Sequence, residues 1–333
     1  MADLAGDDEY DGDVFIYRGG RAPQHITHAR IHESVDEVED DAFNHCENLL
    51  TVDTHDGLRR IGGYAFNDCK SLRRINLKPT VEICQMSFKD CENLEYVEFG
   101  DRLGKVCGMA FEGCASLNHL ILPTITTISF CMFRFCKRLT TVQLSERLEI
   151  IWPNAFTDCK RLQRITVPLK RDLLKIETYF DVDRCMRIAK EYNQFDGCGR
   201  LTTVNLVGGV HKTVASLHME SWRTEMTSEI NRINQVLPTT PANEKTDAIQ
   251  QWMESLLDKL DHYKAEHNSC VKEATALLEL ALWKANLKEN WAEPIEMEGR
   301  KMTRGRKKAR KKFNVTSGAN VVIKNVLPFL QLN

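Results

Sequence analysis

The sequence predicts an α/β repeat fold, a solenoid with a parallel sheet, followed by a C-terminal α-helical hairpin or small bundle. The first observation is a phrase that occurs seven times, in which Phe, Cys, Leu and a β-branched residue or Leu follow one another at intervals of three residues. The second is its period of 22 or 23 residues, interrupted once by a step of 39, which is typical of stacked coils. The third is a change to helical periodicity past residue 210. The phrase starts at Phe43, Phe66, Phe88, Phe111, Phe133, Phe156 and Phe195.

Each repeat contains a strand-like core of the form Leu-x-x-Val-x-Leu, as in residues 72–77. Because the side chains of a strand alternate, we expect Ile75 and Leu77 to be buried and Arg74 and Asn76 to be displayed. A single coil would leave its apolar face exposed, so several coils must stack. The stacked strands should therefore display one continuous face.

Residues 14–212 are assigned to the solenoid. Val14-Phe15-Ile16-Tyr17, followed by Gly19-Gly20, predicts an N-terminal cap within residues 14–31. Residues 26–43 keep the apolar columns of a first coil that lacks the Phe and Cys. Residues 1–13 are rich in Asp and have neither a basic n-region nor an apolar h-region, so we expect an acidic disordered N-terminus and no secretory signal.

The full spacing, Leu-x-x-Val-x-Leu-x(3)-Leu-x-x-Ile-x(4)-Phe-x-x-Cys, resembles the BspA-like class of leucine-rich repeat proteins over roughly residues 20–210. The resemblance implies a leucine-rich repeat solenoid that binds a protein partner. Bacterial members of this class are surface antigens and adhesins, and related protist and microalgal proteins, whose type this chain resembles, form large families. The start of the chain departs from the secreted pattern, so the adhesin role is not carried over.

Seven of the 12 cysteines form one column, with one cysteine in each coil. This regularity predicts reduced, small side chains that pack in the core. The chain has no Cys-x-x-Cys pair and no His at finger spacing from a Cys pair, so we predict no metal site. A reduced column favours an intracellular location, in the cytoplasm or the nucleus. The column consists of Cys46, Cys69, Cys91, Cys114, Cys136, Cys159 and Cys198.

An insertion near residues 168–194 breaks the period. Insertions in solenoids usually project as loops on one face, where partners often bind. A decorated loop with no role is the alternative interpretation.

The region 213–292 is predicted to be helical. Apolar residues give one stripe over residues 217–237, a second over 249–263 and a third over 271–285, and His267-Asn268-Ser269 is the expected join, with one long helix as the alternative. We expect these helices to cap the open end of the solenoid; a groove for a partner helix is the other interpretation.

The tail consists of a basic linker, residues 293–313, and an apolar segment, residues 314–333. The cluster of Lys and Arg residues in the basic linker is interpreted as a nuclear-localisation signal, as an anion-binding patch or as a solvated arm that pairs with the acidic residues upstream. Direct nucleic-acid binding is disfavoured because Phe313 is the one aromatic residue nearby. The basic residues chosen as the candidate site are Arg304, Arg306, Lys307, Lys308, Arg310, Lys311 and Lys312.

Composition and motifs argue against other classes. The net charge of -2 gives no general bias toward polyanions, and no apolar run is long enough to span a bilayer. We find no nucleophile elbow, phosphate loop or dinucleotide fingerprint, so we predict no enzyme activity and no cofactor.

The predicted function is a non-enzymatic protein-protein interaction scaffold that binds an unidentified protein partner on the exposed strand face. Arg, Tyr and an exposed Ile in adjoining coils are residue types that anchor interfaces. A nuclear or nucleic-acid-associated factor acting through the basic tail is the alternative, and a surface adhesin is the third class. The sequence does not specify the oligomeric state. The candidate protein-binding residues are Arg74, Tyr96, Glu98, His119, Ile121 and Arg164.

Overall fold

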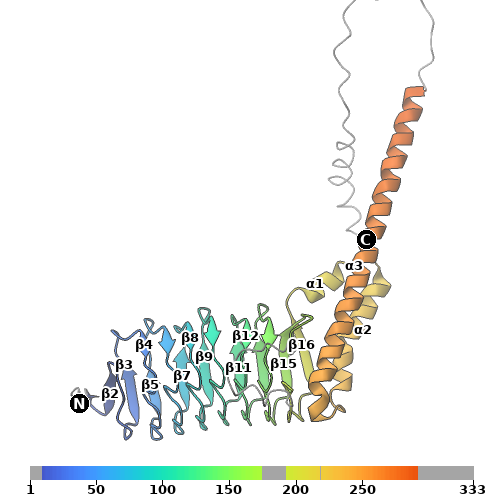
Figure 1. The fold of residues 1–333 in the computed structure, drawn as a ribbon. Helices are drawn as coiled ribbons and strands as arrows, with labels where there is room; N and C mark the ends of the chain where they lie inside the picture. The colour runs from blue at the N-terminus through green and yellow to red at the C-terminus, as the bar shows by residue number, and fades with distance from the viewer. Residues whose placement is uncertain (1–9, 175–192, 218, 292–333) are drawn as a thin grey trace, which may run out of the picture. The chain divides into compact units, whose positions relative to one another are not determined.

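The predicted fold class is confirmed. The computed structural model describes residues 10–174, 193–217 and 219–291. Stacked coils with parallel strands make up the solenoid, and helices follow its last strand (Figure 1). The insertion between residues 175 and 192 and the tail from residue 292 lie outside the described residues.

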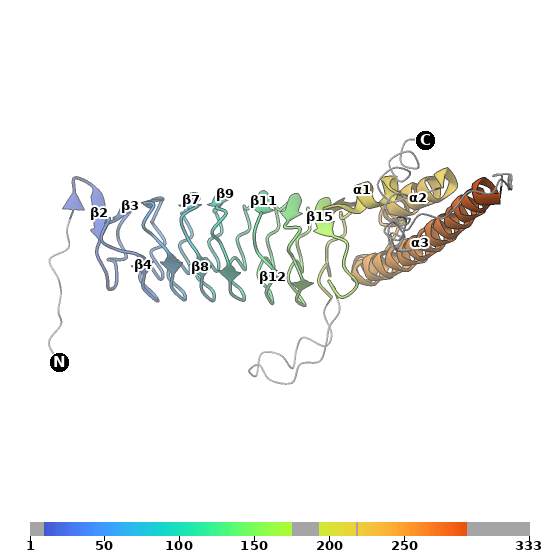
Figure 2. The same cartoon turned by 90° about the horizontal axis from the view of Figure 1, so that it is seen from above.

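Two rows of strands run along opposite sides of the solenoid (Figure 2). The long-strand row consists of β2 (Val14–Tyr17), β3 (His28–Ile31), β5 (Thr51–Asp53), β7 (Arg74–Leu77), β9 (Tyr96–Phe99), β11 (His119–Leu122), β13 (Thr141–Leu144), β15 (Arg164–Pro168) and β16 (Thr203–Val207). The short-strand row consists of β4 (Glu37–Val38), β6 (Arg60–Ile61), β8 (Glu82–Ile83), β10 (Lys105–Val106), β12 (Thr127–Ile128) and β14 (Ile150–Ile151).

Both rows are interrupted between the same two coils. The long-strand row divides into a sheet that ends at β9 and a sheet that starts at β11, and the short-strand row divides between β10 and β12. Phe99 ends β9 at the position that Leu77 and Leu122 hold in the neighbouring coils. Its ring meets that of Phe111 edge-on, with the ring centroids 5.6 Å apart. The interruption therefore coincides with a larger, half-buried side chain at this position.

The N-terminal end of the solenoid carries an extra strand. Strand β1 (Tyr10–Asp11) pairs antiparallel with β2, and β2 pairs in parallel with β3. Tyr10 and Asp11 were expected to belong to a disordered segment. Behind β2, the buried Tyr17 hydroxyl accepts a hydrogen bond from the Glu39 N–H at 3.2 Å, and burial raises the pKa of Tyr17 to about 12. The strand pair closes the first coil.

The phenylalanine column is a continuous stack of buried rings. Successive ring centroids lie between 4.9 and 5.7 Å apart, and the ring planes are within 12° of parallel. The stack continues from Phe156 to Phe195 although 39 residues separate them, because residues 193–198 resume the coil after the insertion. Each ring thus packs on equivalent rings in the neighbouring coils.

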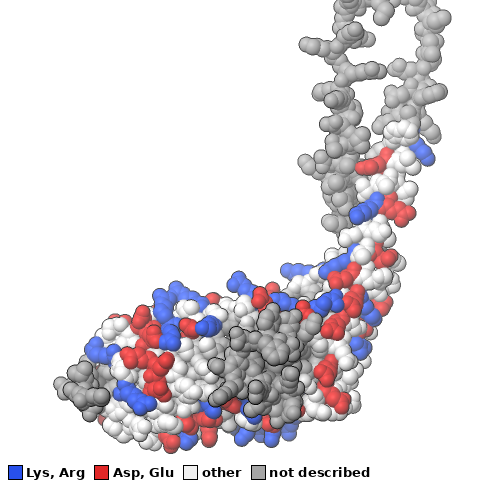
Figure 3. Space-filling view, viewed as in Figure 1, with Lys and Arg blue, Asp and Glu red and all other residues white. Residues whose placement is uncertain are grey.

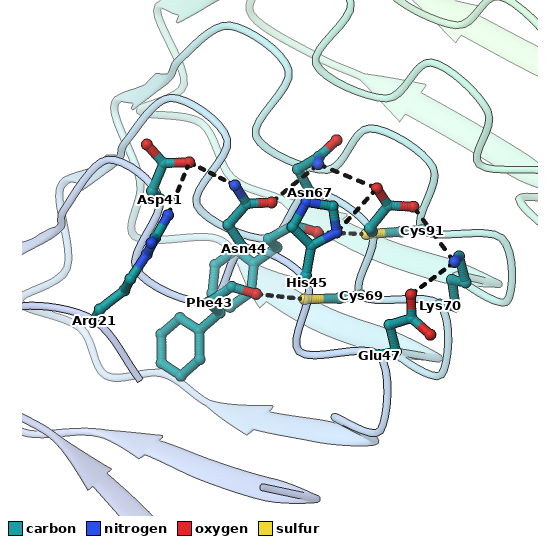
Figure 4. A network of polar contacts seen from close by, with 12 residues as sticks. Arg21, Asp41, Phe43, Asn44, His45, Glu47, Asn67, Cys69, Lys70 and Cys91 are labelled. Carbon is teal, nitrogen blue, oxygen red and sulfur yellow. Dashed lines mark hydrogen bonds and ion pairs between the residues drawn. The ribbon is translucent and has the colours of Figure 1, made fainter. Parts of the chain in front are cut away.

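The column cysteines have free thiols in the structure, and these thiols form a hydrogen-bond ladder. From Cys69 onward, each buried Sγ donates to the carbonyl oxygen of the Phe in the preceding coil, at distances between 3.0 and 3.3 Å. Figure 4 shows the first of these contacts, from Cys69 to Phe43. Burial raises the pKa of these thiols, so they remain protonated donors. A small side chain with a weak donor suits this position.

A second ladder comes from residues with left-handed backbone conformation. In the coil of Phe43, Asp41 and His45 have φ values of 59° and 64°. The backbone N–H groups of Asp41, Phe43 and His45 each donate to a backbone carbonyl of the next coil, at 2.7 to 2.8 Å. The same arrangement recurs in later coils, and Asp, Asn or Gly often occupies the left-handed positions because these residues tolerate positive φ best. The last coil must therefore satisfy such N–H groups with another partner.

The C-terminal region is helical: α1 (Val210–Ala215), α2 (Glu220–Val236), the short 3₁₀ helix η2 (Ala242–Glu244) and α3 (Lys245–Trp291). Trp252 donates its indole N–H to the Glu229 carbonyl at 2.9 Å, and Lys259 pairs with Glu225 and Glu229. These contacts hold α2 and the first part of α3 as a hairpin. The chain divides into two compact units, residues 1–260 and 261–333.

The join expected at His267-Asn268-Ser269 is wrong, because α3 runs through these residues without a break. The segment contains neither Gly nor Pro, and good helix formers such as Lys, Glu and Ala flank it. The alternative of one long helix is therefore correct.

The helices cap the last coil of the solenoid. The Phe195 N–H donates to the Thr246 hydroxyl at 3.1 Å, and the Val204 N–H donates to the Asn234 side-chain oxygen at 2.8 Å. The fully buried Lys245 ammonium donates to the carbonyls of three residues. Polar groups that the next coil would otherwise pair are thus satisfied, as the capping interpretation predicted. These three residues are Gly199 at 3.2 Å, Leu201, and Leu237 at 3.1 Å.

Candidate functional site

The strand face is the outward side of the long-strand row from β5 to β16. On β7, Ile75 and Leu77 are buried, whereas Arg74 and Asn76 are exposed. The same alternation occurs on β11 and β13. Backbone pairing with neighbouring coils fixes each outward side chain to a rigid support, so this face can present a constant arrangement of groups. The outward residues are Thr51, Asp53, Arg74, Asn76, Tyr96, Glu98, His119, Ile121, Thr141, Gln143, Arg164, Thr166, Thr203 and Asn205.

Two large apolar side chains interrupt this mostly polar face. Tyr96 on β9 is 52% exposed and Ile121 on β11 is 59% exposed. They lie on the two strands that border the interruption of the row. Single exposed apolar residues are common on protein surfaces, whereas two on adjacent coils are candidate anchors for a partner.

Three of the four other predicted binding residues lie near this pair, on β7, β9 and β11. Arg74 is exposed and lies opposite Tyr96 in the β7–β9 register. Glu98 is half-buried, and its carboxylate lies 2.6 Å from the Lys78 ammonium. The structure thus places polar groups beside Tyr96, with Glu98 already engaged in an ion pair.

His119 and Arg164 extend the set toward the C-terminal coils. His119 is exposed and lies opposite Thr141 in the β11–β13 register. Arg164 is exposed on β15, opposite Thr141 on one side and Thr203 on the other. Arg164 therefore lies two strands from Ile121 and does not belong to the immediate surroundings of the apolar pair.

Several charges in the N-terminal coils are paired across coils. Arg30 lies 3.1 Å from Asp11 and 3.8 Å from Asp53, and Lys70 lies 2.8 Å from Glu47 (Figure 4). The face drawn in Figure 3 likewise shows acidic and basic side chains beside one another in this part of the solenoid.

The C-terminal coils differ, because exposed basic residues gather there at equivalent positions. Arg138, Arg161 and Arg200 each follow a column cysteine by two residues. Of the basic residues in this region, only Arg164 was predicted from the sequence as a binding residue. Their constant offset from the cysteine column was the signal that could have identified them. We name this set the basic ladder: Lys137, Arg138, Lys160, Arg161, Arg164 and Arg200.

The second predicted site lies outside the described residues. This applies to Arg304, Arg306, Lys307, Lys308, Arg310, Lys311 and Lys312 of the basic linker. The structure therefore does not test the nuclear-localisation or anion-binding prediction.

Other chemistry finds little support in the described part of the chain. Residues 10–174, 193–217 and 219–291 contain no group of three or more His, Cys, Asp or Glu residues placed to hold a metal ion. Burial raises the pKa of the column thiols, which opposes their use as nucleophiles. No described helix is both long enough and apolar enough to cross a membrane.

Exposed apolar side chains also occur on α3 beyond residue 260. In that unit Leu277, Leu280, Leu282 and Trp283 are exposed. All four lie within residues 271–285, where the sequence predicts the third apolar stripe.

Comparisons with solved structures find bacterial leucine-rich repeat proteins. The T. pallidum leucine-rich repeat protein is 21% identical, with a TM-score of 0.38, and the match covers 60% of this chain and 79% of that one. A leucine-rich cell surface protein from Faecalibacterium prausnitzii A2-165 is 19% identical, with a TM-score of 0.28 and coverage of 55% and 64%. A leucine-rich repeat protein from Bacteroides ovatus ATCC 8483 is 18% identical, with a TM-score of 0.34 and coverage of 55% of both chains. The chain thus spans less than two thirds of the latter two proteins.

No curated protein matches the sequence significantly. The family described as BspA type leucine rich repeat region does match, in six copies over residues 22–104 and 80–180. These residues contain the Phe, Cys and Leu columns from Phe43 to Leu162 and the strands that display the candidate site. Residues 22–180 of this chain therefore consist of BspA-type leucine-rich repeats.

Proposed function

We propose that this protein is a non-enzymatic interaction scaffold that binds a protein partner on the strand face. The exposure of Tyr96 and Ile121 on neighbouring coils is the observation that carries the proposal. Its leucine-rich repeat family supports a scaffold role in general terms. The strand face supplies the specific surface.

The energetics favour these two residues as anchors. Full burial of a large apolar side chain contributes about 1.5 to 3 kcal/mol. Because about half of Tyr96 and Ile121 is already covered, a partner that covers the remainder would gain about 1 kcal/mol from each. The backbone of both strands is already ordered by the solenoid, so binding there costs little conformational entropy. Polar groups around them, such as Arg74 and His119, would supply specificity at the rim.

The test is a quantitative pull-down from nuclease-treated lysate with three full-length baits. The first bait is the wild-type chain, and the second carries Tyr96→Ser and Ile121→Ser. The matched control carries Tyr64→Ser and Val81→Ser, which removes two side chains that are each 40% exposed and lie outside the strand face.

We expect a protein that the wild type and the control retain and the strand-face variant loses. That protein, once purified, should bind the strand-face variant at least tenfold more weakly, since two anchors of about 1 kcal/mol each amount to more than a factor of ten. Equal losses from both variants, or no loss from either, would refute the proposal.

A fourth bait tests the basic tail, with residues 306–312 neutralised. Loss of every partner from this bait would instead support a nuclear or nucleic-acid-associated factor, as would a partner that the wild type captures from untreated lysate but not from nuclease-treated lysate. We also propose an intracellular location, and the reduced cysteine column supports it. Imaging of a tagged full-length chain tests the location, and export to the cell surface would overturn it.

A further inference from the structure

The basic ladder lies at one end of the long strands, in three consecutive coils. Arg138, Arg161 and Arg200 come two residues after Cys136, Cys159 and Cys198. The strands that follow are in register, since Thr141, Arg164 and Thr203 lie opposite one another. Equivalent residues of paired strands lie about 4.8 Å apart. The three turns therefore place their arginines one above another along the solenoid.

These charges are exposed and largely uncompensated. In the described part of the chain, Arg138, Arg161 and Arg200 have no side-chain hydrogen bond or salt bridge. The same turns carry Asp158 and Asp196, and Asp158 lies 3.8 Å from Lys160. Like charges that face one another across strands are destabilising.

The N-terminal coils show the opposite arrangement at the corresponding position. The residue after the column cysteine is Glu47 in one coil and Lys70 in the next, and their side chains lie 2.8 Å apart. In the C-terminal coils this position holds Lys137 and then Lys160, so neighbours carry the same sign. The same fold can therefore pair these charges, and the basic ladder leaves them available for an external anion.

We propose that the basic ladder binds an acidic segment of a protein partner, an inference that rests on the proposed scaffold function and names the chemistry of its partner. Arginine presents a planar fork that matches a carboxylate. Three coils span about 10 Å, which is the length of about three extended residues. A short run of Asp or Glu has this length and charge density.

Continuity with the strand face favours a peptide over a nucleic acid. Arg164 joins the ladder to that face, two strands from Ile121. A segment that covers Ile121 with an apolar residue can continue onto the ladder with its acidic residues. Single-stranded nucleic acids bind through stacking on aromatic side chains, and among the described residues between Ile121 and Met219 no large aromatic side chain is exposed.

The experiment measures fluorescence anisotropy of labelled hexaglutamate with the full-length chain, in a background with Gln at every basic residue from 306 to 312, so that the tail does not contribute. The ladder variant carries Arg138→Gln, Arg161→Gln and Arg200→Gln. The matched control replaces three exposed arginines at the other end of the long strands, which also have no side-chain partner in the described structure. The control substitutions are Arg59→Gln, Arg102→Gln and Arg147→Gln.

We expect the ladder variant to bind about tenfold more weakly and the control to change by less than about twofold, because each exposed charge contact contributes only modestly. Binding should also weaken between about 50 mM and about 200 mM salt. No binding to the parent chain at millimolar peptide, or equal losses in both variants, would overturn the proposal. Tighter binding of labelled hexathymidylate than of hexaglutamate would overturn it in favour of nucleic acid.

The outcome is separable from that of the scaffold proposal. Hexaglutamate has no apolar side chain to cover Tyr96 or Ile121, so its binding reports on the ladder alone. A partner lost from the Tyr96→Ser and Ile121→Ser bait but retained by the ladder variant would leave the scaffold function standing and reject only the acidic segment.

Discussion

The cap at the C-terminal end of the solenoid depends on one buried lysine, and its replacement is the sharpest test of the fold. Lys245 begins α3 and has no exposed surface. Its ammonium donates to the carbonyls of Gly199 and Leu201 in the last coil and of Leu237 after α2. Lys245→Met keeps a long apolar stem of similar length but removes all three donors. The helical hairpin should then lose its main polar attachment to the last coil.

The expected cost follows from opposing terms. Each hydrogen bond from a charged donor contributes about 1.5 to 3 kcal/mol, while desolvation of the ammonium costs several kcal/mol and the substitution recovers that cost. What remains is mainly the penalty of three buried carbonyls without their donor, at about 1 to 3 kcal/mol each when no other partner replaces it. We expect the free energy of unfolding to fall by about 3 kcal/mol for Lys245→Met.

Lys259→Met is the matched control. This lysine is on the same helix, and its ammonium lies 3.1 Å from Glu225 and 3.2 Å from Glu229, but its side chain is partly exposed. Solvent screens such a pair, so its loss should cost less than about 1 kcal/mol. Urea denaturation followed by circular dichroism gives both free energies, and amide hydrogen exchange in β16 shows whether the last coil opens first. Similar values for the two variants would refute the assignment of Lys245 as the polar centre of the cap.

Three further predictions concern the repeat itself. Cys114→Ala should lower the free energy of unfolding by about 2 kcal/mol, because it leaves a small cavity and removes the donor 3.2 Å from the Phe88 carbonyl oxygen; denaturant titration checks this, and an unchanged midpoint would contradict the ladder. Gly100→Ala should destabilise by about 1 to 3 kcal/mol, since its Cβ would come within 2.0 Å of a backbone oxygen in the preceding coil, whereas Gly104→Ala would meet its nearest such oxygen at 3.8 Å and serves as the control in the same titration. The free energy of unfolding under reducing conditions should fall as pH rises above about 9. Burial raises the pKa of the column thiols in the folded chain, that of Cys46 to about 11, so the unfolded chain loses these protons at lower pH than the folded chain. Equal free energies of unfolding at about pH 7 and about pH 10 would argue against buried thiols.

The period of the sequence was sufficient to predict the solenoid because each column has one physical task. Phe88, Cys91 and Leu94 all lie in the core, as their spacing predicted. The alternation after Leu94 also predicted that Tyr96 is exposed and Val97 buried. The buried positions could be predicted because burial favours the same class of residue at the equivalent position of every coil.

Other features could not be predicted from the pattern, because they depend on contacts distant in sequence. The thiol of Cys69 meets the Phe43 carbonyl 26 residues earlier, a contact that no spacing rule contains. From the sequence, Lys245 resembles an exposed residue at the start of a helix. Its hydrogen bond to the Leu201 carbonyl oxygen depends on the folded arrangement of segments that are distant in sequence. The long helix α3 was predicted with a join because His, Asn and Ser resemble a turn, although none of them forces one.

The buried positions that stabilise the solenoid differ from the outward positions that a partner could contact. Phe111 and Cys114 are fully buried against neighbouring coils, so a substitution at either position changes the stability of the fold and does not change the surface that a partner would contact. Outward positions carry no such constraint, since Ile121 on one coil and Gln143 on the next occupy paired places in the same register. A functional surface on this fold must therefore be sought where neighbouring coils differ without structural need. By that criterion, the apolar pair beside the interrupted sheet and the basic ladder are two candidate surfaces among the described coils.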